Sequence, residues 1–201
     1  VIWSMRGWDI NAEINDILLD YGRLYFGEEQ AARAADGIFA LEHNWVGPIK
    51  ENGSIATTFE FWKKLEKENP QLANNWRWQM LVLRAYYDNY QRLRKIYETE
   101  LEDQANEILI QAENIGSEEA MAKSLEIVNK ADTEPVAQDL HQKVEEYADM
   151  LFKSIGLQTS VPLHQASGSQ RGCILELVNH PFNNRWWLED EFNKIRELPT
   201  E

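Results

Sequence analysis

The stretch that decides the fold is Asn75–Ala112, NWRWQMLVLRAYYDNYQRLRKIYETELEDQANEILIQA. Neither Gly nor Pro, the residues that most often interrupt a helix, occurs in these 38 residues. Apolar and aromatic residues recur at alternating spacings of four and three, and Arg94 fills one gap in the series Trp76, Met80, Leu83, Tyr87, Tyr90, Tyr97, Leu101 and Ile108. This spacing predicts one continuous helix, about 57 Å long at 1.5 Å per residue, that packs along its whole length.

A second apolar stripe runs along another face of the first half of this stretch, through Trp78, Val82, Ala85 or Tyr86, Leu93 and Ile96. A helix that is apolar on two faces has neighbours on two sides. We therefore predict an all-α protein, a bundle of about seven to eight helices around one long central helix.

The rest of the chain supplies those neighbours as a single helical domain over residues 1–201. Stop and cap signals place helices at about 10–26, 28–46, 57–69, 117–128, 135–155, 173–178 and 184–198, with a capping box at Thr57 and Glu60. Residues 1–9 are expected to form a short lead segment and residues 157–170 a loop. Small residues between 31 and 37 predict a close approach to a partner helix.

Composition limits the classes of function. The net charge is −14, and no cluster of Lys and Arg could follow a phosphate backbone, so no nucleic-acid partner is expected. No apolar run approaches the roughly 20 residues of a membrane span. The sequence opens on Val1 rather than Met, so we expect it to be a fragment of a longer protein or a processed chain.

Aromatic residues are the most unusual feature, with 8 Trp, 7 Tyr and 7 Phe. Indole and phenol rings can stack on the apolar faces of sugar rings, while Asn, Arg and carboxylates can bond sugar hydroxyls. Two stretches combine these residue types, Asn74–Trp78 and Asn183–Trp187. The alternative is that these tryptophans fill the core, where large aromatic side chains dominate the packing energy. Adjacent Trp186 and Trp187 point about 100° apart on a helix, which favours exposure of one of them.

No motif for catalysis or for a metal is found. The Glu-x-x-His pattern of di-metal helical bundles does not occur, and Glu176 and His180 match it only at a different spacing. The clustered acids Glu13, Asp16 and Asp20 share a helix face and are interpreted as solvated charge. Cys173 lies beside apolar residues and is interpreted as a buried small side chain. We therefore expect no catalytic residue, no metal and no cofactor.

The segments Met5–Asp9 (MRGWD) and Tyr21–Gly27 (YGRLYFG) resemble the helical region that follows the catalytic barrel in large bacterial glycoside-hydrolase-like proteins, of the α-glucuronidase and β-hexosaminidase-like kind. Asn75–Tyr87 and Asn184–Glu191 are similar in style to that module. Their acid–base carboxylates lie in the barrel, which has no counterpart in this chain.

The resemblance implies an accessory, non-catalytic domain that braces an upstream catalytic domain of the same chain. It also implies carbohydrate as a ligand, with a binding role expected for Arg6, Trp8, Asn184, Arg185 and Trp186. The compartment would be periplasmic or extracellular if the parent protein is a secreted glycoside hydrolase. The alternative hypothesis is a helical module for protein–protein interaction or oligomerisation, suggested by the heptad-like central helix and the acidic surface.

Overall fold

The computed structural model of the protein describes residues 1–166 and 180–198, and this part of the chain contains helices but no strand, which confirms the all-α prediction. In this described part, eight α-helices have seven or more residues: α1 (Ile2–Trp8), α2 (Ile14–Phe26), α3 (Glu28–His43), α4 (Ser54–Glu68), α5 (Trp76–Ile110), α7 (Ser117–Val128), α9 (Gln138–Ile155) and α12 (Arg185–Arg196). Shorter turns of helix are η1 (Pro70–Leu72), α6 (Ala112–Ile115), α8 (Lys130–Thr133) and α10 (Val161–His164). Within these residues, no helix combines the length and the apolar character that crossing a bilayer requires.

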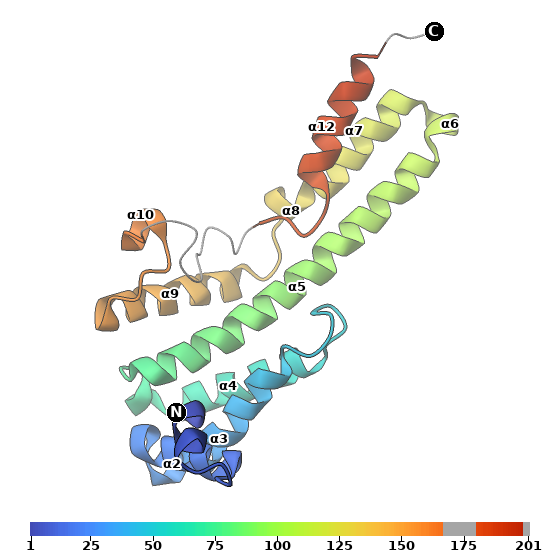
Figure 1. The fold of residues 1–201 in the computed structure, drawn as a ribbon. Coiled ribbons are helices and arrows are strands. Elements are labelled where there is room, and N and C mark those ends of the chain that lie inside the picture. Colours follow the sequence, from blue (N-terminus) through green and yellow to red (C-terminus); the bar gives the residue numbers. More distant parts are fainter. Residues whose placement is uncertain (167–179, 199–201) are drawn as a thin grey trace.

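The long helix α5 is the axis of the molecule (Figure 1). Helices α2, α3 and α4 lie on one side of its first half, α9 lies on the other side, and α7 and α12 lie along its second half. Its start is fixed by Asn75, whose side-chain oxygen accepts from the backbone N–H of Arg77 at 3.0 Å. The amide of Asn75 also donates to the carbonyl of Tyr25 at 2.7 Å, which ties α5 to the end of α2.

At the start of α5 the second stripe is the more deeply buried one. Trp78, Val82 and Ala85 are buried, whereas Met80 is exposed and Trp76 is only partly covered. Farther along the helix Tyr90 and Leu101 of the longer stripe are buried as well, so both stripes contribute to packing.

Most of the buried apolar residues form two clusters, and among the helices that the structure describes only α5 contributes buried residues to both. The larger cluster lies between α2, α3, α4, α5 and α9, where the rings of Trp62 and Trp78 meet edge to face with centroids 5.4 Å apart. The smaller cluster joins the far half of α5 to α7 and α12 through Ala105, Met121, Val128, Leu188 and Phe192. The long helix therefore connects two cores.

Several boundaries differ from the sequence expectations. The lead segment contains a helix, α1, and α4 begins at Ser54, upstream of the expected capping box at Thr57. Pro135 precedes α9 instead of lying in its first turn, because Ala137 takes a left-handed conformation just before Gln138. The expected loop 157–170 contains α10, its last four residues lie outside the described part, and so does the helix expected at 173–178.

Helices α2 and α3 approach closely, as the small residues predict. Ala31 and Ala34 are buried on the α3 side. On the α2 side, a methyl group added at Gly22 would lie 2.7 Å from the carbonyl oxygen of Ala31. Only glycine therefore fits at this crossing.

We expect Gly22→Ala to lower the free energy of unfolding by about 1–3 kcal/mol, because the helices must separate to admit the methyl group. Urea unfolding followed by circular dichroism measures this change. Gly53→Ala is the matched control, since Gly53 has an ordinary helical conformation and open space around its Cα. Equal stability of the two variants would contradict the close packing.

A polar link joins three helices in the larger core. The carboxylate of Glu66 on α4 accepts from the Tyr86 hydroxyl of α5 at 2.8 Å and from the Tyr147 hydroxyl of α9 at 2.5 Å. Burial first, and then the bond to the Glu66 carboxylate, raises the pKa of both Tyr86 and Tyr147 above the usual value for tyrosine. Both hydroxyls therefore remain protonated donors well into the alkaline range.

This link makes stability sensitive to high pH. The unfolded chain loses tyrosine protons near pH 10 while the folded chain keeps them, so stability is complete below about pH 10 and falls as the pH rises further. The double variant Tyr86→Phe and Tyr147→Phe is expected to start less stable at pH 7 and to lose less stability between about pH 10 and 12. Parallel curves for wild type and variant, from urea unfolding at each pH, would refute this account.

Candidate functional site

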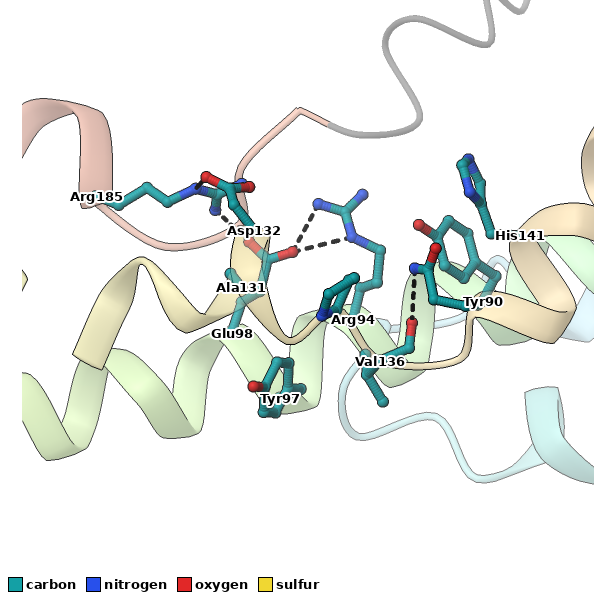
Figure 2. Close-up of a pocket in the computed structure, with 11 residues that line it drawn as sticks. Tyr90, Arg94, Tyr97, Glu98, Ala131, Asp132, Val136, His141 and Arg185 are labelled. Carbon is teal, nitrogen blue, oxygen red and sulfur yellow. Dashed lines mark hydrogen bonds and ion pairs between the residues drawn. The ribbon is translucent and has the colours of Figure 1, made fainter. Parts of the chain in front are cut away.

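A pocket of about 240 Å³ opens beside the middle of α5, where α8, α9 and the start of α12 meet (Figure 2). It brings together residues far apart in sequence, such as Glu98 and Arg185, which are 87 positions apart. Its lining is polar and aromatic: Tyr90, Arg94, Tyr97, Glu98, Ala131, Asp132, Pro135, Val136, Gln138, His141 and Arg185.

The floor of the pocket is a buried charge, the carboxylate of Glu98, which is only 2% exposed. Arg94, one turn earlier on α5, donates to its Oε1 from Nη2 at 2.6 Å and from Nε at 2.9 Å. Arg185 of α12 donates from Nη1 to Oε2 at 2.8 Å, and the backbone N–H of Phe182 donates to the same oxygen at 2.8 Å. Four hydrogen bonds compensate for the loss of water around this carboxylate.

Arg185 is itself 3% exposed and extends the cluster to α8. Its guanidinium forms a bidentate ion pair with Asp132, in which Nε donates to Oδ2 at 3.0 Å and Nη2 donates to Oδ1 at 2.8 Å. Arg94 also donates to the carbonyl of His180 at 3.1 Å. Two arginines thus balance two carboxylates, and the pairs fasten the segment from His180 to Arg185 onto α5 and α8.

The wall of the pocket toward α9 carries the remaining polar groups. The His141 ring stacks on Tyr90 with centroids 5.0 Å apart, and its Nε2 lies 3.7 Å from a carboxylate oxygen of Glu145. Burial raises the pKa of the Tyr90 and Tyr97 hydroxyls, so both stay protonated at neutral pH.

This arrangement does not match a glycosidase pair. Such a pair needs two carboxylates about 5–10 Å apart on either side of a sugar bond. Here the guanidinium of Arg185 lies between Glu98 and Asp132 and occupies that space. Nor do the described residues group three or more His, Cys, Asp or Glu side chains as a metal ion would require.

Next to the pocket, the start of α12 presents an aromatic surface. Trp186 is 57% exposed and Trp187 is 59% exposed, so both face solvent. The ring of His180 meets the Trp186 ring edge to face, with centroids 5.3 Å apart. Asn184 is exposed, and its amide donates to the carboxylate of Glu102 on α5.

The other two residues with an expected binding role lie at the opposite end of the molecule. Trp8 is 95% exposed on α1, and Arg6 donates to the carbonyl of Ile10 at 2.9 Å. Helix α1 packs on α2, which is bonded to the start of α5 (Figure 1). From Asn75 to Glu102, α5 covers about 40 Å at 1.5 Å per residue. The five expected residues therefore form two separate surfaces, and Arg185 lies beneath one of them in ion pairs.

The tryptophans of the two aromatic stretches differ in exposure. In Asn74–Trp78, the Trp78 side chain is buried in the core. The Arg77 guanidinium lies over the Trp76 ring, with its Cζ 4.1 Å from the ring centroid. In Asn183–Trp187 both tryptophans are exposed. The buried cluster around Glu98 was not expected from the sequence. Its one visible signal was Arg94, which fills the gap in the apolar stripe four residues before Glu98.

Removing the charge of Glu98 tests the cluster. We expect Glu98→Gln to lower the free energy of unfolding by about 3–5 kcal/mol, because both arginines lose their buried partner. Glu100→Gln on the exposed face of α5 should change it by less than about 0.5 kcal/mol. Urea unfolding measures both variants, and equal effects would show that the cluster adds nothing to stability.

Comparison of the chain with protein-family models, with curated proteins and with solved structures found no match.

Proposed function

We propose that this chain is a non-catalytic accessory domain of a bacterial glycoside-hydrolase-like protein. In this proposal its helical bundle braces the catalytic domain of the same chain and contributes surface to carbohydrate binding. The family resemblance of the Met5–Asp9 and Tyr21–Gly27 segments suggests the kind of parent protein. The argument from geometry is separate and rests on α1.

The observation that carries the proposal is the exposure of α1. Trp3 is 93% exposed and Trp8 is 95% exposed, and none of the seven residues of this helix is buried. Ile10, in the turn after α1, and Leu24, on the adjoining helix α2, are exposed as well. Tryptophan is strongly enriched where proteins contact one another. An aromatic helix that adds nothing to the core is well suited to packing against another domain.

The rest of the fold supports a bracing role. Both apolar clusters and the Glu98 cluster hold their helices to α5, so a domain bound at α1 would be joined to a rigid body. Such a body adds stiffness and surface without needing catalytic groups of its own.

Iodide quenching of tryptophan fluorescence tests the docking role. In the isolated chain we expect iodide to quench Trp3 and Trp8, so that Trp3→Phe with Trp8→Phe removes much of the accessible signal. In the parent protein, the neighbouring domain should shield these two side chains. Trp45→Phe is the matched control, because Trp45 is exposed beside the loop that follows α3.

Two results would contradict the proposal. One is equal quenching of Trp3 and Trp8 in the isolated chain and in the parent protein. The other is turnover of aryl-glycosides by the purified chain that is lost on mutating one of its own carboxylates.

The second candidate function is a helical interaction or oligomerisation module, and the same α1 surface favours it. In that case a second copy of the chain, or another protein, would cover Trp3 and Trp8. Light scattering across a concentration series separates the two. A dimer that is abolished by Trp3→Ala with Trp8→Ala supports self-association, and a monomer at all concentrations counts against it.

A further inference from the structure

The start of α12 alternates anchored and exposed side chains. Asn183 donates to the carbonyl of Val128 at 3.1 Å, and Arg185 is held by Glu98 and Asp132. Leu188 is buried in the smaller apolar cluster. The backbone that carries the exposed tryptophans is therefore held in place by three anchored residues, Asn183, Arg185 and Leu188.

Trp186 and Trp187 are accordingly preorganised for a ligand. Trp186 is further restrained by the edge-to-face contact with His180. An exposed aromatic ring on an immobile backbone loses little conformational entropy when a ligand covers it. Rigid aromatic side chains of this kind are typical anchors of binding surfaces.

The charge around these rings is negative. Glu189 and Asp190 are exposed one turn along α12 from Trp186, at the positions that share its face. Neither forms an ion pair in the part of the chain that the structure describes. Glu102 adds a third carboxylate beside Asn184. Lys95 of α5 directs its ammonium to the carbonyl of Phe182 at 3.3 Å, and Lys194 of α12 pairs with Glu191 at 2.6 Å.

We propose that Asn184, Trp186 and Trp187 form a binding surface for an uncharged oligosaccharide. The indole rings can stack on the apolar faces of pyranose rings, and the carboxylates of Glu102, Glu189 and Asp190 can accept bonds from sugar hydroxyls. The same carboxylates repel an acidic sugar such as a uronate. This inference rests on the carbohydrate-binding part of the proposed function, for which it names the surface and the class of sugar, and it does not depend on what covers α1.

Tryptophan fluorescence of the purified chain, titrated with neutral and acidic oligosaccharides, tests this surface. The neutral probes are cellohexaose, xylohexaose and maltohexaose, and the acidic probe is a galacturonic acid hexamer. We expect a saturable change with at least one neutral probe and weaker binding of the acidic one. Trp186→Ala and Trp187→Ala should each weaken the neutral complex by about tenfold or more, through loss of the stacking ring.

Two controls make the test specific. Trp45→Ala removes an exposed indole in the loop after α3, outside every expected binding residue, and should leave sugar affinity unchanged. Glu189→Gln with Asp190→Asn should strengthen binding of the acidic probe while preserving the neutral complex. Circular dichroism checks that each variant is folded, which is expected because all the altered side chains are exposed.

The inference is overturned if none of the three neutral probes gives a saturable change. It is also overturned if the acidic probe binds more tightly than all of them, or if Trp186→Ala and Trp187→Ala bind as the wild type does. None of these results alters the expected shielding of Trp3 and Trp8, so the two proposals fail separately.

Discussion

The second half of the molecule depends on one buried carboxylate. Glu98 accepts hydrogen bonds from Arg94 of its own helix and from Arg185 and Phe182 of the C-terminal segment. A charge removed from water is tolerated only where such partners are in place. Glu98 therefore ties the start of α12 to the middle of α5, and Asp132 ties α8 to the same Arg185 guanidinium.

Apolar contacts alone would define the docking of α12 poorly. The smaller cluster holds only five buried residues, and hydrophobic contact has no direction. Ion pairs between planar groups do have direction, because the guanidinium of Arg185 meets Asp132 through two parallel bonds. We infer that the apolar cluster supplies attraction between α12 and the body, whereas the charge cluster fixes the rotation and register of the helix. The rotation of the helix in turn determines which side of α12 is exposed.

The sequence predicted the helical class and the central helix well, because periodicity over 38 residues without Gly or Pro is a local signal. It also predicted the close packing at Ala31 and Ala34. It could not show which stripe is more deeply buried at the start of α5, since the burial of Trp78 and the exposure of Met80 depend on where α4 and α9 lie. For the same reason it could not separate core tryptophans from exposed ones, or pair Glu98 with an arginine 87 positions away.

The continuity of α5 has a further consequence. Thirty-five residues without a break give a stiff rod of about 52 Å, and α1 and α12 are held near its opposite ends. Two objects bound at those ends would be kept at a set spacing, with neither able to slide toward the other. The chain would then act as a molecular ruler, and inserting a single residue into α5 would rotate one end about the axis by about 100° while lengthening the rod by only about 1.5 Å.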